Sequence, residues 1–151
     1  MKNRNRNTEL RDRDFADCCV ETVRRARFNN EQLSSAEAVA RAMAMRPRAF
    51  YVSSGYAYNQ VLRIRQMGGD RYSTMATEPS ELMWLEIYER VMAAMESGDH
   101  FCLFSAVVSV VDSRPTRFYL SRRRAIEIFN GVVRRDVTFT PRKSYSEQPW
   151  I

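Results

Sequence analysis

The sequence predicts an all-α protein, a tandem duplication of a three-helix unit that is helix-turn-helix-like. Three observations lead to this fold class. Apolar residues recur at helical spacing over most of the chain, a constant offset aligns the first half with the second, and serine, proline and glycine stand where helices should begin or end. One short connector in each unit is expected to be extended.

The repeat is clearest in two strings, RPRAFYVS at 46–53 and RPTRFYLS at 114–121. An offset of 68 residues aligns both strings and carries the similarity without a gap from residue 14 to 66. Eleven of these 53 aligned positions hold identical residues, whereas about three identities are expected from average composition. We therefore expect a tandem duplication.

The offset divides the chain into five segments. We expect a basic N-terminal tail at 1–8, a first repeat at 9–67, a polar linker at 68–79 that opens on two glycines, a second repeat at 80–135 and a C-terminal tail at 136–151. The C-terminal tail has no helical period. It is either flexible or an arm whose aromatic residues dock on a neighbour.

Each repeat is expected to form three helices, with one apolar stripe on each helix facing a shared core. In the first repeat the first helix spans 9–28, and its counterpart in the second repeat begins near 80. The expected core positions are Phe15, Cys19, Val23, Ala26, Val39, Ala42, Met43, Ala57, Val61 and Ile64 in the first repeat, and Met83, Ile87, Val91, Ala94, Ala125, Phe129 and Val132 in the second.

Capping residues mark the ends of these helices. Ser34 and Glu37 have the spacing of a capping box at the start of the second helix, which Pro47 should stop. Ser53 and Ser121 are good N-cap residues for the third helices. Each FYVS or FYLS motif is thus predicted to connect a second helix to a third.

Two functions of this motif stay open. In one, the phenylalanine and tyrosine fill the gap between helices and the serine caps the next helix. In the other, Tyr51 and Tyr119 contact a ligand together with the neighbouring arginines.

At the two copies of P-x-x-F-Y-[V/L]-S, each after an Ala/Val-rich helix, the sequence resembles small basic uncharacterised proteins encoded on prophages and mobile elements of gut bacteria. The resemblance covers most of both repeats. Its distinctive residues are Pro47, Phe50, Tyr51, Ser53, Pro115, Phe118, Tyr119 and Ser121. It implies a bacterial or phage protein that works in the cytoplasm, and it assigns no catalytic or binding residue.

The chain is basic, with 24 Lys and Arg against 18 Asp and Glu and an isoelectric point near 9.6. Every basic residue except Lys2 and Lys143 is an arginine. Arginine suits bidentate contacts with phosphates and guanines, although genomic base composition produces the same bias. A basic balance favours a polyanionic partner such as nucleic acid.

The outer faces of the third helices carry residue types that contact nucleic acid. Asn and Gln pair with adenine, whereas arginines hold guanines or phosphates. A solvated helix face carries the same residue types, and the connector is longer than the turn of about three to four residues in a standard helix-turn-helix. The predicted contacts are Asn59, Gln60, Arg63 and Arg65 in the first repeat and Arg122, Arg123, Arg124, Asn130, Arg134 and Arg135 in the second.

Charge placement supports a single binding face. Residues 114–143 contain nine basic side chains against two acidic ones, whereas residues 78–112 contain seven acidic side chains and one arginine. We expect a non-enzymatic protein that binds nucleic acid, with double-stranded DNA as the expected form. The alternative is a protein–protein adaptor or a structural component of a phage or mobile-element apparatus. Such a protein would contact its partner, or a second copy of itself, through Trp84 and Tyr88.

Neither an enzyme, a metal site nor a cofactor is expected. His100 is the single histidine, and the sequence has no zinc-ligand spacing, glycine-rich phosphate loop or nucleophile elbow. Cys18 and Cys19 are expected to be buried small hydrophobes. The three cysteines form no plausible disulfide framework, and neither a secretory signal nor a membrane span is apparent, so we expect a soluble cytoplasmic protein without a membrane partner.

Overall fold

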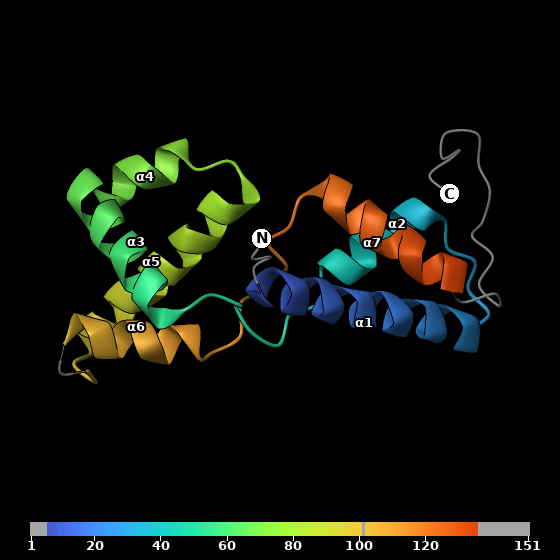
Figure 1. Ribbon diagram of the computed structural model, residues 1–151, viewed down its shortest axis with the longest axis horizontal. Helices are drawn as coiled ribbons and strands as arrows, with labels where there is room; N and C mark the ends of the chain where they lie inside the picture. The colour runs from blue at the N-terminus through green and yellow to red at the C-terminus, as the bar shows by residue number, and fades with distance from the viewer. Residues whose placement is uncertain (1–5, 101, 136–151) are drawn as a thin grey trace. The chain divides into compact units, whose positions relative to one another are not determined.

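The computed structural model describes residues 6–100 and 102–135, and these residues form α-helices and the segments between them (Figure 1). The predicted all-α fold class is confirmed. Predictions about residues 1–5, Phe101 and the C-terminal tail lie outside the described residues. The helices are α1 (Arg6–Phe28), α2 (Ser35–Met43), α3 (Ser54–Met67), α4 (Gly69–Met75), α5 (Pro79–Ser97), α6 (Leu103–Val111) and α7 (Arg122–Arg135).

The predicted caps are confirmed at three helix starts. Ser34 and Glu37 form the capping box of α2: the Glu37 amide donates to Ser34 Oγ at 3.1 Å, and the Ser34 amide donates to Glu37 Oε1 at 2.9 Å. Ser53 accepts from the Tyr56 amide at 3.2 Å at the start of α3. Ser121 accepts in the same way at the start of α7. These signals act over three residues, which is why the sequence alone reveals them.

Three local predictions are corrected. Helix α1 begins at Arg6, inside the segment predicted as the tail 1–8, because nothing between residues 6 and 9 opposes helix. The linker 68–79 contains the seven-residue helix α4. The FYVS connector is not extended throughout, because Tyr51 has φ +61° and lies in the left-handed region.

Helix α4 can form where it does because residue 69 is a glycine. A Cβ at Gly69 would lie 2.7 Å from Cε2 of Tyr88, a contact too close for any side chain. The Tyr72 hydroxyl of α4 donates to the Glu81 carbonyl at 3.0 Å and fixes α4 to the start of α5.

The chain folds into two compact units, and they differ from the two predicted repeats 9–67 and 80–135. The terminal unit (residues 1–47 and 116–151) contains α1, α2 and α7, and the central unit (residues 48–115) contains α3 to α6. Figure 1 shows α7, in orange, beside α1, in blue, although they lie at opposite ends of the chain. In the central unit α3 packs against α5 and α6. Each predicted third helix therefore packs on the first two helices of the other predicted repeat.

This grouping also corrects the helix-turn-helix-like arrangement. Such a motif needs two consecutive helices packed against each other. Here α2 and α3 belong to different units, as do α6 and α7. Ten residues separate the helices of each pair, and ten residues can span up to about 33 Å. The connectors are thus long enough to carry each third helix to another scaffold.

The core of the terminal unit is built on three phenylalanines. Phe15 of α1 and Phe118 of the second connector meet edge to face, with ring centroids 5.1 Å apart, and Phe129 of α7 is fully buried beside them. Small side chains surround these rings. The other buried members are Cys18, Cys19, Val23, Ala26, Leu33, Ala38, Val39, Ala42, Leu120, Ala125 and Val132.

The core of the central unit consists mainly of aliphatic side chains, with one phenylalanine from the first connector. Its buried members are Phe50, Ala57, Val61, Ile87, Val91, Ala106, Val107, Val110 and Val111, and Trp84 and Tyr88 pack against them at the edge. All core positions expected on α1, α3 and α7 are buried. No described helix is both long and apolar enough to cross a membrane.

Candidate nucleic-acid interface

Positive charge is concentrated in the terminal unit. Its described residues include 14 arginines and 8 carboxylates, a net charge of +6, whereas those of the central unit include 6 arginines and 8 carboxylates, a net charge of −2. The difference arises because the arginine-rich α7 joins the arginine-rich α1 rather than the acidic α5. A polyanion is therefore attracted more strongly to the terminal unit.

Helix α7 carries exposed arginines at both ends. Arg122 and Arg123 lie in its first turn, and Arg134 and Arg135 in its last. Arg123 and Arg134 are about 17 Å apart along the helix axis at a rise of about 1.5 Å per residue. This separation exceeds the major-groove width of about 12 Å. A helix placed across or within the groove could thus bring arginines to both walls.

The charge of the first turn of α7 opposes its helix dipole. A helix N-terminus is positive and favours acidic side chains, as Glu37 in α2 and Glu81 in α5 illustrate. The first turn of α7 contains no acidic residue and opens with three arginines. A sequence that breaks a local rule commonly does so at a functional site, and an anion bound at this helix end would relieve the repulsion.

Arg124 differs from the other arginines of α7 because it joins two helices. Its guanidinium donates to Asp12 Oδ2 of α1 at 2.8 and 3.2 Å and to Glu127 Oε1 at 2.9 Å. These hydrogen bonds, first to Asp12 and then to Glu127, raise the pKa of Arg124. Arg11 also donates to Asp12. Arg124 thus holds α7 on α1, and its charge is already compensated within the unit.

The middle of the outer face of α7 offers little for base recognition. Glu127 is exposed there and faces Arg123 and Arg124. Asn130 is half-buried and its side-chain oxygen is enclosed, so the predicted base contact would require this side chain to turn outward. The exposed residues of α7 therefore suit phosphates better than base edges.

The structure does not bring the two predicted groups of contacts into one unit. The residues from the first repeat lie on α3 in the central unit, where Asn59, Arg63 and Arg65 are exposed and Gln60 is half-buried. They share that unit with the acidic helix α5. The residues from the second repeat all lie on α7 in the terminal unit.

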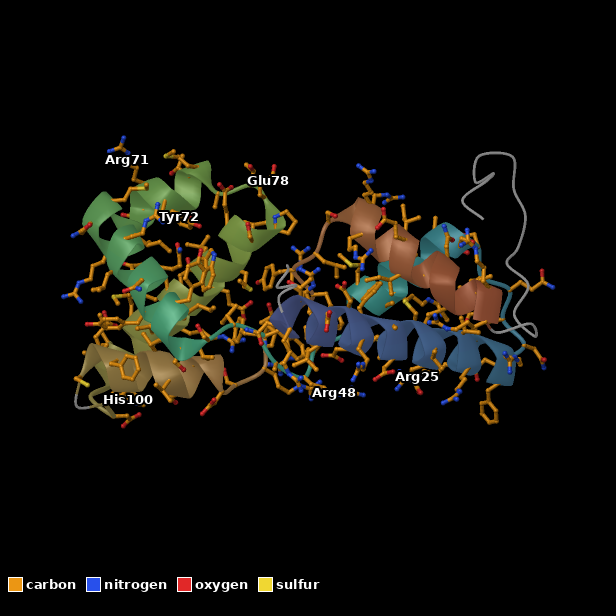
Figure 2. All side chains as sticks on the ribbon, in the orientation of Figure 1. Arg25, Arg48, Arg71, Tyr72, Glu78 and His100 are labelled. Atoms are coloured by element: carbon orange, nitrogen blue, oxygen red, sulfur yellow. The ribbon has the colours of Figure 1, made fainter. Side chains whose placement is uncertain are left out.

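Trp84 and Tyr88, the predicted protein contacts, are largely used inside the central unit. Trp84 meets Tyr56 of α3 edge to face at 5.5 Å, and Tyr88 lies against Gly69 of α4. Figure 2 shows Tyr72 on the side of α4 that faces α5, with Arg71 projecting away. Helices α3 and α4 thus occupy the side of α5 that carries this pair.

The two connectors combine a structural function with an unassigned surface. Phe50 and Phe118 are buried in the cores, which agrees with the first of the two alternatives for this motif. Tyr51 and Tyr119 are half-buried. The Arg117 guanidinium lies over the Tyr119 ring, 5.2 Å from its centroid, just before α7 begins. This arginine was not among the predicted contacts, although its place four residues before Ser121 marks it as a neighbour of the first turn.

Arg90 is a structural residue that the sequence did not reveal. It pairs with Glu86 on α5, donates to Ser113 Oγ at 3.0 Å and to the Arg114 carbonyl at 2.8 Å, and lies 5.4 Å from the Phe50 ring centroid. One side chain therefore holds both connectors to the central unit. Apart from Glu86, its partners are 23 to 40 residues away in the sequence, so no local pattern predicts them.

The cysteines and the histidine form no reactive group with one another. Cys18 and Cys19 are buried as expected. Desolvation, reinforced by repulsion from Cys18, raises the pKa of the Cys19 thiol to about 12. His100 Nδ1 lies 3.5 Å from Ser105 Oγ. Within residues 6–100 and 102–135 no group of three or more His, Cys, Asp or Glu side chains is placed to hold a metal ion.

Comparisons with known proteins found no match: no family model fits the chain, and no curated protein or solved structure is detectably similar to it.

Proposed function

We propose that the protein binds nucleic acid through the terminal unit, with the exposed arginines of α7 on the phosphates. The observation that carries this proposal is the positive charge in the first turn of α7, where no acidic residue is present and Arg122 and Arg123 stand exposed at the positive end of the helix. Among the described residues, no carboxylate pairs with Arg122, Arg134 or Arg135. Catalysis is not part of the proposal.

Recognition in this proposal depends on the backbone more than on base sequence. Because Glu127 and the half-buried Asn130 occupy the middle of α7, the helix has few groups that would distinguish base pairs. Double-stranded DNA is the expected form, since the helix ends can reach both walls of a major groove. Bacterial or phage origin and a cytoplasmic location belong to the same proposal.

The duplication also belongs to the proposal. The 68-residue offset relates buried positions of one unit to buried positions of the other, including Val23 with Val91 and Phe50 with Phe118. A duplication followed by exchange of third helices would explain why one unit is basic and the other slightly acidic.

The test is fluorescence anisotropy of labelled duplex DNA at several salt concentrations, with two charge-matched variants. Arg122→Gln/Arg134→Gln removes two charges from α7, and Arg63→Gln/Arg65→Gln removes two from α3. Arg124 stays intact because it holds α7 on α1. Binding should weaken steeply with salt, and the α7 variant should reduce the slope of log K against log salt by about 2, at about 0.9 per phosphate contact.

The control variant separates this site from general charge attraction. The α3 variant should bind nearly as tightly as the wild type, because its charges lie on the acidic central unit. Equal weakening by both variants would refute a site on α7. Absence of binding by the wild-type protein at low salt would refute nucleic-acid binding altogether.

The adaptor function is retained as a second candidate because of one apolar feature of the central unit. Phe104 of α6 is 46% exposed and packs edge to face on Tyr58 of α3 at 5.4 Å. An apolar contact of this kind would persist at high salt, whereas phosphate binding would be lost.

A further inference from the structure

The cores of the two units use equivalent positions drawn from different repeats. The 68-residue offset relates Cys19 to Ile87 and Ala42 to Val110 on the first two helices, and Val61 to Phe129 on the third. All six side chains are buried. In each unit the third-helix residue comes from the other repeat, so the two cores can be compared position by position.

We call the observed packing exchanged, because each third helix packs on the first two helices of the other repeat; in the unexchanged packing it would pack on those of its own repeat. Side-chain size at these positions matches the exchanged packing. The terminal unit combines the small Cys19 and Ala42 with the large Phe129, and the central unit combines the large Ile87 and Val110 with the smaller Val61. Packing each third helix on its own repeat would combine Cys19 and Ala42 with Val61 and would leave a cavity. It would also combine Ile87 and Val110 with Phe129 and would overpack the other core. Both errors are destabilising.

A second pair of equivalent positions points the same way by its chemistry. Residues 56 and 124 are related by the offset, and each contacts the first helix of the other repeat. Arg124 is paired with Asp12 of α1 at 2.8 Å, and Tyr56 meets Trp84 of α5 edge to face. In the unexchanged packing the aspartate would meet a tyrosine and the tryptophan an arginine, so the ion pair would be lost.

We propose that the two halves of the chain are binding partners that donate their third helices to each other. The surface of α1 and α2 is the docking site for α7, and the surface of α5 and α6 is the docking site for α3. Side-chain size in the two cores and the residue at position 56 or 124 select this pairing over the unexchanged one. The proposal rests on the proposed duplication and does not depend on nucleic-acid binding.

Cross-linking in the full chain distinguishes the two packings. Two double variants are made in a Cys102→Ser background: Asp12→Cys with Arg124→Cys, and Asp12→Cys with Tyr56→Cys. The first pair is in contact in the exchanged packing, and in the unexchanged one residue 56 would take the place of residue 124. A short bismaleimide should join 12 to 124 within one chain in higher yield than 12 to 56. Linkage of 12 to 56 in place of 12 to 124, or products that join two chains, would overturn the proposal.

A nicked chain gives an independent measurement that leaves both docking surfaces untouched. A protease site is inserted between Ala76 and Thr77, in the turn between α4 and α5. After cleavage the two fragments should elute together in gel filtration at the volume of the intact chain, with unchanged helix content, because each unit contains helices from both fragments. Separation of the fragments under native conditions would refute mutual docking.

Exchanging Val61 and Phe129 tests whether side-chain size in the cores selects the partner of each third helix. In Val61→Phe/Phe129→Val the large side chain moves to the third helix of the first repeat, so matched cores now require the unexchanged packing. The yield of the 12–124 cross-link should fall and that of the 12–56 cross-link should rise. Unchanged yields in a folded double variant would show that side-chain size does not select the partner.

Discussion

The terminal and central units each contain helices from both predicted repeats but differ in charge and in core chemistry. The terminal unit is basic and built around three phenylalanines, whereas the central unit is slightly acidic and largely aliphatic. At positions that the 68-residue offset aligns, the terminal unit combines the small Cys19 and Ala42 with the large Phe129, and the central unit combines the larger Ile87 and Val110 with the smaller Val61. The comparison teaches that packing partners, rather than sequence neighbours, constrain each position.

The largest difference in stability should appear at the third-helix position of the core. Phe129→Ala should destabilise the terminal unit by about 3–5 kcal/mol, because it removes a fully buried ring and leaves a cavity. Val61→Ala at the equivalent position should destabilise the central unit by about 2 kcal/mol, since fewer methyl groups are lost. Hydrogen exchange followed by peptide mass spectrometry reports on each unit separately. If the Phe129→Ala substitution increased the exchange rate more in α5 and α6 than in α1 and α2, relative to the wild-type protein, the exchanged packing would be contradicted.

The next effect concerns how the units hold their connectors. Arg90→Met should destabilise the central unit by about 2 kcal/mol, because it removes charge-assisted hydrogen bonds to Ser113 and Arg114 in a partly exposed site. The 68-residue offset relates Arg90 to Thr22 in the terminal unit. The Thr22 hydroxyl donates to the Cys18 carbonyl at 2.8 Å within α1. Thr22→Val should destabilise the terminal unit by about 0.5 kcal/mol or less. Urea titration measures both variants, and equal losses would argue against a connecting function for Arg90.

A smaller effect depends on pH and should be confined to the terminal unit. The pKa of the Cys19 thiol is raised from 9.0 to about 12 in the folded chain. Its contribution to stability is therefore full below pH 9 and is lost as the pH rises toward 12, which amounts to about 1 kcal/mol at pH 10. The equivalent residue in the central unit is Ile87, which does not titrate.

Urea titrations at pH 8 and pH 10 measure this difference. The terminal unit should lose stability between these two pH values, and the Cys19→Val variant should remove most of the loss. Burial raises the pKa of Tyr72 in the central unit, so higher pH would also affect that unit and is avoided. A pH response that persists in Cys19→Val would assign it to another group.

Much of the local structure was predictable because its causes are local. The capping box at Ser34 and Glu37, the caps at Ser53 and Ser121, and the apolar stripes all follow from residues within one or two turns of each other. Helix α4 was missed because two glycines open a short segment without a periodic stripe. The close approach of Gly69 to Tyr88 and the hydrogen bond from Tyr72 to Glu81 explain its position.

The partner of each third helix could not be predicted from the apolar pattern. Helices α3 and α7 bury the same three positions, so either fits either scaffold by pattern alone. The deciding features are volumes and one ion pair, between Asp12 and Arg124, that joins residues 112 apart. The same contact changes the candidate site: Arg124 was predicted to meet nucleic acid with its neighbours, and its charge is instead compensated within the unit. The nucleic-acid contacts themselves stay predictions.

The smallest effect sharpens the comparison at two capping boxes. In the terminal unit a serine caps α2, whereas in the central unit Glu78 and Glu81 form the box of α5. Glu81 Oε1 accepts from the amides of Thr77 and Glu78, each at 3.1 Å, and these hydrogen bonds lower the pKa of Glu81 from 4.5. A lowered pKa means that the contribution to stability is present above pH 4.5 and is lost as the pH falls through the folded-state value. Acid should therefore loosen the start of α5 by this route.

Carbon-detected NMR titration of the Glu81 carboxyl measures the pKa directly, and amide exchange at residues 79–82 measures the loosening. Glu81→Gln should abolish the acid-dependent part of that loosening. Glu89→Gln removes the same charge from an exposed position further along α5 and should leave it unchanged. If Glu81 instead titrates at or above 4.5, the two amides do not stabilise its charged form, and α5 is started by its proline at N1 and its packing against α3, α4 and α6.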